Sequence, residues 1–247
     1  MNLVDLHTVA PAFLAFFVAA FLKGITGLGF STICLPILTT FLDLKVSIPL
    51  VIVPSLASNV LVMAQAGRFT EAFGRFWPIY ISAIPGLVLG VSVLHAVQSS
   101  LSRAVLGGVL LVYALWALRA KAVVLPTRAA AWLAGPVGFA TGVVNGITGS
   151  QVMPVLPFFL ALRLDTDLFV QAINLSFTLS SVVMLGLLSG IGLLTAPIAI
   201  TAGFGVFPVA LGVVLGGKLR RALAEERFRR IVLLFLMVVG VSLIVRI

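Results

Sequence analysis

The sequence predicts an all-α polytopic membrane protein with two inverted-topology repeats of about five hydrophobic segments each. Hydrophobic residues make up 61% of the 247 residues and charged residues only 9%, whereas about a quarter of the residues in a soluble domain are charged. The charges separate long apolar runs, such as 46–66, 75–97, 167–189 and 228–245. Because ~18 apolar residues can cross a ~30 Å hydrocarbon core, several such runs exclude a soluble fold.

A duplicated motif predicts the repeats. The tetrapeptide Gly-Ile-Thr-Gly occurs at 24–27 and again at 146–149. Other matches follow in the same order: Pro36 with Pro157, 58–63 with 179–184, and the Gly-x-x-x-Gly at 86–90 with the one at 212–216. The order of these matches predicts a first repeat at 1–122 and a second at 123–247, within one membrane domain.

Hydropathy divides each repeat in the same way. The first repeat contains segments 10–22, 25–42, 46–66, 75–97 and 103–119, and the second contains 129–145, 147–163, 167–189, 195–217 and 228–246. The first segment of each repeat is short, with thirteen and seventeen residues. The first pair of each repeat is therefore either a broken or re-entrant hairpin with the tetrapeptide at its tip, or two full spans.

The basic residues predict the orientation of the chain. With five segments per repeat and the Lys218–Arg230 loop in the cytoplasm, thirteen of the sixteen Lys and Arg residues fall on the inner side, as the positive-inside rule requires. Four segments per repeat would place the Arg119–Arg128 linker outside. Five segments place the N-terminus outside and invert the second repeat relative to the first. Inverted repeats are typical of secondary transporters with a substrate site near the midplane, although a scaffold can also be duplicated.

The tetrapeptides and their polar neighbours are the predicted substrate site. Glycines permit a sharp break and close approach of a ligand, and we expect a helix to begin there with its N–H groups and positive dipole end towards an anion. Packing of the glycines against other helices, or an ordinary surface loop, is the alternative. The candidate residues at the two tips are Lys23, Gly24, Thr26, Gly27, Gly29, Asn145, Gly146, Thr148, Gly149, Ser150 and Gln151.

Two asparagines complete this set. Asn59 and Asn174 lie within long apolar segments and should point away from lipid, either as substrate contacts or as interhelical hydrogen-bond partners. Lys23 has two possible roles. It is a ligand if the tips reach the midplane, and a snorkelling boundary residue if the first segment spans fully. No acidic residue lies deep in an apolar run, which favours an anion carrier over a carboxylate-based cation pathway.

Other functions find little support in the sequence. The chain lacks a His-Glu-x-x-His motif and a pair of intramembrane aspartates, and Ser150 has no histidine within obvious reach, so we expect no enzymatic activity, cofactor or metal. The net charge of +9 resides in loops and at helix ends, where it indicates topology and contact with anionic lipid rather than nucleic acid. Cys34 is the single cysteine and cannot form an internal disulfide.

With these residues, the chain resembles the TauE/SafE-type sulfite exporter family. The stretches from Gly24 to Pro36 and from Asn145 to Pro157, with the two Gly-x-x-x-Gly motifs, carry the resemblance. It covers nearly the whole chain and implies a bacterial or archaeal cytoplasmic-membrane permease for sulfite, sulfonates or related small oxyanions. A negative cell interior favours export of one negative charge by ~2.3 kcal/mol per 100 mV. Uptake by proton or sodium symport and a non-transporting scaffold remain alternatives.

Overall fold

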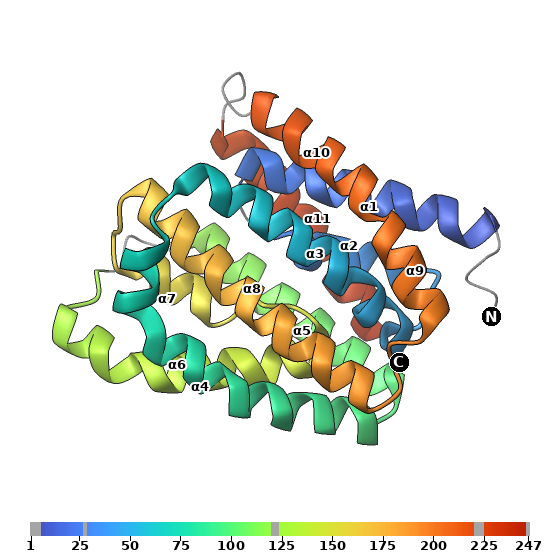
Figure 1. Cartoon of the computed structure of the whole chain (residues 1–247), viewed down its shortest axis with the longest axis horizontal. Coiled ribbons are helices and arrows are strands. Elements are labelled where there is room, and N and C mark those ends of the chain that lie inside the picture. Colours follow the sequence, from blue (N-terminus) through green and yellow to red (C-terminus); the bar gives the residue numbers. More distant parts are fainter. Residues whose placement is uncertain (1–5, 27–28, 120–123, 220–224, 246–247) are drawn as a thin grey trace.

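The protein is a bundle of α-helices. The computed structural model describes residues 6–26, 29–119, 124–219 and 225–245, and these ranges contain helices α1 to α11 and no strand (Figure 1). Six helical stretches are long and apolar enough to cross a membrane: α3 (Leu44–Ala66), α4 (Phe69–Ala96), α5 (Ser99–Arg119), α6 (Thr127–Thr148), α8 (Thr166–Gly190), and the consecutive pair α9 (Ala196–Phe204) and α10 (Val206–Leu219). The predicted all-α polytopic membrane protein is confirmed.

The first helix of each half is longer than its hydropathy predicts. α1 (Leu6–Thr26) has 21 residues and α6 has 22, because each helix continues through most of its tetrapeptide. Gly24 and Gly146 lie in the last turns of these helices. The expectation that a helix begins at each tetrapeptide is therefore wrong. The following helices begin only at Phe30 and Val155.

The second helix of each half is too short to span a membrane. α2 (Phe30–Leu38) has nine residues and α7 (Val155–Ala161) has seven, which correspond to lengths of about 14 Å and 11 Å. A full span needs ~30 Å. In each pair a long first helix is followed by a helix of only nine or seven residues, which does not fit the alternative of two full spans.

The predicted segment 195–217 consists of two helices rather than one. α9 ends at Phe204 and α10 begins at Val206. Pro208 has no N–H to donate to the carbonyl of Phe204, so the helical ladder is interrupted there. At the junction, a Cβ on Gly205 would lie 2.5 Å from the ring of Phe16 in α1, so this position must remain small.

Helices from the two halves of the chain pack in pairs. α1 packs on α10, α4 on α6, α3 on α8, and α5 on α11 (Glu225–Val245). Figure 1 shows the α1–α10 pair at one edge, the α4–α6 pair at the opposite edge, and α3 and α8 between them. α3 and α8 are the most buried of the six long stretches, with 61% of each apolar window inside the protein. These two central helices provide the inner wall of the candidate site.

Candidate functional site

Lys23 is buried within the helix bundle. Its side chain is 1% exposed, and its ammonium group donates hydrogen bonds to Ser58 Oγ at 3.1 Å and to Asn59 Oδ1. Asn59 lies seven residues before the end of α3, about 10 Å from that end along the helix axis. A snorkelling lysine would extend to the membrane surface, so this arrangement fits the ligand role better. In the described part of the chain, no carboxylate forms an ion pair with Lys23.

Asn145 holds the equivalent position in the second half, directly before the second tetrapeptide. Its side chain is 0% exposed, and neither Nδ2 nor Oδ1 has a hydrogen-bond partner among the described residues. The adjacent turn is well ordered by its own bonds. Thr148 Oγ1 donates to Val144 O at 2.7 Å and accepts from the Ser150 N–H at 3.1 Å. This turn is therefore held by its own hydrogen bonds, while the polar atoms of Asn145 are buried without a partner among the described residues.

The turn after the second tetrapeptide contacts the first half of the chain inside the protein. Thr32, near the start of α2, and Ser150, just after the second tetrapeptide, place their hydroxyl oxygens 3.5 Å apart. Gly149 ends α6 with φ 71°, and a Cβ there would lie 2.8 Å from Leu35 Cδ1 of α2. The turn after the second tetrapeptide thus lies directly against the short helix of the first half.

Further amides are buried in the bundle. Gln151 donates to Ser181 Oγ of α8 at 3.1 Å, and Asn174 donates to Val170 O of its own helix at 2.9 Å. Asn59 Nδ2 and Gln171 Oε1 are buried without a partner among the described residues. Buried polar atoms in proteins are normally bonded, so the unbonded Nδ2 of Asn59, beside the buried ammonium of Lys23, marks a place where a polar solute would fit.

The glycines of the predicted site have different surroundings. Gly24 and Gly146 face the backbones of α10 and α4, so helix packing accounts for their size. Gly29 has φ 89° and precedes α2, a conformation that favours glycine. Gly27 and the side chain of Thr26 lie outside the described residues. A direct contact between any of these residues and a substrate stays a prediction.

A cavity of about 370 Å³ adjoins the first tip. Gly29 and Thr32 line it, as do Val152, next to the second tip, and Arg163, at the connection between α7 and α8. The sequence reasoning did not include Thr32 or Arg163 in the site. Thr32 is a polar residue in an apolar segment, so the sequence could have selected it as a site residue. Arg163 lies at the end of such a segment, where a basic residue indicates membrane topology rather than a binding site.

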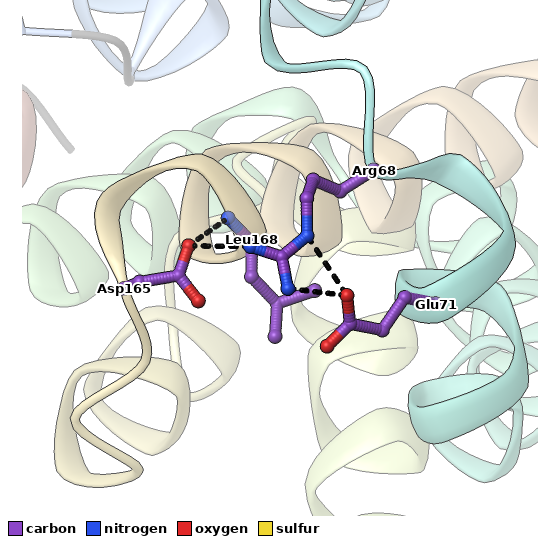
Figure 2. A network of polar contacts seen from close by, with 4 residues as sticks. All are labelled: Arg68, Glu71, Asp165 and Leu168. Atoms are coloured by element: carbon purple, nitrogen blue, oxygen red, sulfur yellow. Dashed lines mark hydrogen bonds and ion pairs between the residues drawn. The ribbon is translucent and has the colours of Figure 1, made fainter.

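An ion-pair network joins the two halves at one end of the bundle (Figure 2). Arg68 donates from Nη1 to Asp165 Oδ1 at 3.1 Å and from Nε to Glu71 Oε2 at 2.8 Å. Asp165 also caps α8 by accepting from the Leu168 N–H at 3.0 Å. That N–H, together with the nearby Arg68, lowers the pKa of Asp165 below its usual value, while the hydrogen bond to Glu71 raises the pKa of Arg68.

This chain is a multi-pass helical protein with buried hydrogen-bond donors where its two halves meet. Such an arrangement is typical of a membrane carrier for a small polar solute. The chain belongs to the sulfite exporter TauE/SafE family, whose model matches residues 12–243. The resemblance noted from the sequence is thereby confirmed. This is a family of transporters rather than enzymes, and it indicates a membrane exporter of sulfite or a related anion. No curated protein and no solved structure gives a significant match.

Proposed function

We propose that this chain is a secondary transporter that exports small sulfur-containing oxyanions, such as sulfite or sulfonates, by alternating access. The observation that carries the proposal is the buried ammonium of Lys23, bonded only to neutral partners among the described residues, in a bundle where Thr32 and Ser150 bring the two halves of the chain into contact. A buried charge is costly unless a counter-charge accompanies it. A bound anion would supply that counter-charge.

The packing directions support two inverted repeats, 1–122 and 123–247. Gly212 and Gly216 of α10 face residues 17–21 and 21–24 of α1 in rising order, so these helices run parallel. Gly138 and Gly146 of α6 face residues 79 and 90 of α4 in the same manner. The ion pair between Arg68, after α3, and Asp165, before α8, fits antiparallel central helices. This set of directions matches the topology with five segments per repeat, cytoplasmic Arg68 and an external N-terminus.

The proposed site uses donors from both repeats. Lys23 supplies the charge, and the Nδ2 groups of Asn59 and Asn145 supply N–H donors that have no other partner among the described residues. Thr32, Ser150 and Gln151 add further polar groups at the junction. Oxyanions accept hydrogen bonds from several directions, and charge-assisted bonds of this kind are the strongest available to a protein.

The helix pairs indicate which parts would move together. Each long first helix carries one tip and is tied by glycine contacts to a helix of the other half, α1 to α10 and α6 to α4. Closely packed helices move as rigid units. We therefore expect the α1–α10 and α4–α6 pairs to move in opposite directions against α3 and α8, exposing the tips first to one side and then to the other.

Flux in proteoliposomes tests this function. Vesicles that contain the purified chain should release sulfite, thiosulfate or an organosulfonate faster than empty vesicles, and an imposed potential should change the rate of monoanion flux. A rate that rises with a proton or sodium gradient would instead support symport. The absence of flux for all these anions would contradict the proposed substrate class and would favour the scaffold alternative.

A further inference from the structure

The ammonium group of Lys23 lies in surroundings without negative charge. Its own helix α1 contains no acidic residue, and neither do α2, α3 and α10, which pack on α1. The acidic side chains that the structure describes lie instead at the beginnings of other helices: Asp43 before α3, Glu71 in the first turn of α4, and Asp165 and Asp167 at the start of α8. Within the described part of the chain, the charge of Lys23 is therefore not neutralised by a carboxylate.

The hydrogen-bond partners of Lys23 place this charge inside the membrane-spanning part of the bundle. Ser58 and Asn59 of α3 are 0% and 1% exposed. With 23 residues, α3 is about 35 Å long, and Asn59 lies about 10 Å from its nearer end. The ammonium group thus lies within the thickness across which a membrane potential falls.

The groups around the ammonium are neutral and leave hydrogen-bond donors for an anion. The Ser58 hydroxyl donates to Ser55 O at 2.7 Å, so only its oxygen is presented to Lys23. Asn59 also accepts from Lys23 through Oδ1, while its Nδ2 has no partner among the described residues. An ammonium group has three N–H donors, and Ser58 and Asn59 use two of them. The remaining N–H and Nδ2 of Asn59 can both donate to a bound anion.

The net charge of this site differs between the loaded and the unloaded carrier. With a monoanion bound, the ammonium and the anion form a neutral pair, whereas without one the site keeps a single uncompensated positive charge. While the carrier changes sides, the site must be closed to both solutions, so bulk water cannot hydrate that charge. A buried charge that has lost its partner is strongly unfavourable. The unloaded carrier should therefore change sides more slowly than the loaded one.

We infer that this protein is also an anion exchanger, which moves an anion outward fastest when a second anion is carried back on the return. The inference rests on the proposed function and deepens it. An anion on the outer side neutralises Lys23 for the return step and removes the slowest step of the cycle. Net export needs an unloaded return, and a negative cell interior favours that return because it attracts the positive site inward. The membrane potential thus acts on the unloaded return rather than on the outward movement of a monoanion.

Radiolabel flux from proteoliposomes separates the two modes. Vesicles that contain the full-length chain are loaded with radiolabelled methanesulfonate, which is a monoanion at any working pH. They are then diluted into unlabelled methanesulfonate for exchange or into gluconate for net efflux, and a potassium gradient with valinomycin sets the potential. Exchange should be at least about tenfold faster than net efflux and should not respond to the potential, whereas net efflux should change severalfold. Sulfite in weakly acidic buffer repeats the comparison, with the leak of empty vesicles subtracted.

Variants at position 23 link this behaviour to the buried charge. Lys23→Arg keeps a positive charge and should retain faster exchange than net efflux, whatever its absolute rate. In Lys23→Met the loaded form carries the uncompensated charge, so residual exchange should be no faster than residual net efflux. Lys45→Met is the control, because it removes a lysine that donates to His95 O near one end of the bundle, and it should behave as the unaltered chain does. If the residual flux of Lys23→Met is too small to compare, the response of the unaltered chain to the potential decides.

Equal rates of exchange and net efflux in the unaltered chain would overturn the inference. An exchange rate that responds to the potential as strongly as net efflux would overturn it as well. So would insensitivity of both modes to the potential together with proton movement that matches the anion flux, because Lys23 would then lose its proton whenever the anion leaves. In each of these cases the anion flux persists, and only the inference fails. Absence of flux in both modes, for both anions, removes the proposed function itself.

Discussion

Gly146 of α6 and Gly90 of α4 are in direct backbone contact. A Cβ on Gly146 would lie 2.7 Å from the Cα of Gly90, and a Cβ on Gly90 would lie 2.8 Å from the Cα of Gly146. The same relationship joins Gly24 of α1 to Gly216 of α10, at 3.0 Å and 3.1 Å. The first glycine of each tetrapeptide thus pairs with the last glycine of the Gly-x-x-x-Gly motif in the other half. Two motifs that are distant in sequence have one shared packing role.

Gly90→Ala should destabilise the protein. The added methyl group meets backbone atoms of α6, which cannot move aside without separating the helices, and such overpacking costs about 1–3 kcal/mol. Gly74→Ala, in the same helix, is the control because no atom lies within 4 Å of its added Cβ. That change should be neutral or stabilising, since alanine favours a helix. Thermal unfolding in detergent compares the two, and equal stability of both variants would contradict the close contact.

Lys23→Met should abolish most anion transport without unfolding the chain. Methionine fills a similar volume and removes the buried charge, so the site loses its strongest attraction for an anion. We expect at least a tenfold loss in transport efficiency, the size of a single charge-assisted hydrogen bond. Lys45→Met is the control. It removes a lysine from the same half whose ammonium donates to the backbone oxygen of His95. Unchanged flux in Lys23→Met would show that the ammonium group has a structural role only.

Thr32→Val should lower the apparent affinity for the transported anion. Valine has nearly the same shape, but it removes the hydroxyl that contacts Ser150 and faces the cavity. Loss of one neutral hydrogen bond corresponds to roughly a threefold to tenfold change. Thr141→Val is the matched control because that hydroxyl is also buried but donates to Val137 O in its own helix. Concentration-dependent flux measures both, and an equal effect at the two positions would argue against a site at the tips.

Asp165→Asn should lower the unfolding temperature near neutral pH. The pKa of Asp165 is lower in the folded protein than its usual value of 3.8, because the Leu168 N–H and Arg68 stabilise the carboxylate. Its contribution to stability is therefore present above about pH 4 and is lost as the pH falls through the lower folded-state pKa. The difference between the variant and the unaltered chain should shrink in acid. Asp167→Asn, which removes a carboxylate from the same turn but leaves the Arg68–Asp165 ion pair in place, should have a smaller effect.

Cysteine labelling tests the orientation. In a Cys34→Ala background, Thr70→Cys lies in the exposed first turn of α4 and Ser189→Cys in the exposed last turn of α8. A membrane-impermeant maleimide applied to intact cells should label position 189 and should reach position 70 only after permeabilisation. The reverse pattern would place the N-terminus inside, and labelling of both positions from one side would contradict the antiparallel arrangement of α3 and α8.

Several features of the fold were within reach of the sequence. Long apolar runs predicted the membrane helices, because the hydrocarbon core requires a minimum length of apolar chain. The capping residues carry a further signal, since Asp43 and Asp165 cap α3 and α8, which would occupy equivalent places in two repeats. The extension of α1 through Gly24 was not readable, because glycine is unfavourable in an isolated helix.

The candidate site was predictable in composition but not in arrangement. Polar residues at membrane depth are costly, so Lys23, Asn59 and Asn145 could be selected from the sequence alone. Their contacts could not, since the bond between Lys23 and Asn59 joins residues 36 positions apart and the Thr32–Ser150 contact joins residues 118 positions apart. Arg163 entered the site only through the cavity that it lines.

The sequence by itself determined that this protein crosses a membrane several times and that it belongs to the family of sulfite exporters. Composition and repeated motifs are local properties, and the hydrophobic effect and helix geometry act on them directly. The tertiary structure alone decided that the tetrapeptides end helices rather than begin them, and that their glycines pack on the opposite half. It also decided that Lys23 is enclosed rather than snorkelling. These outcomes depend on close packing between distant segments, where a single methyl group or a single buried charge is enough to select one arrangement.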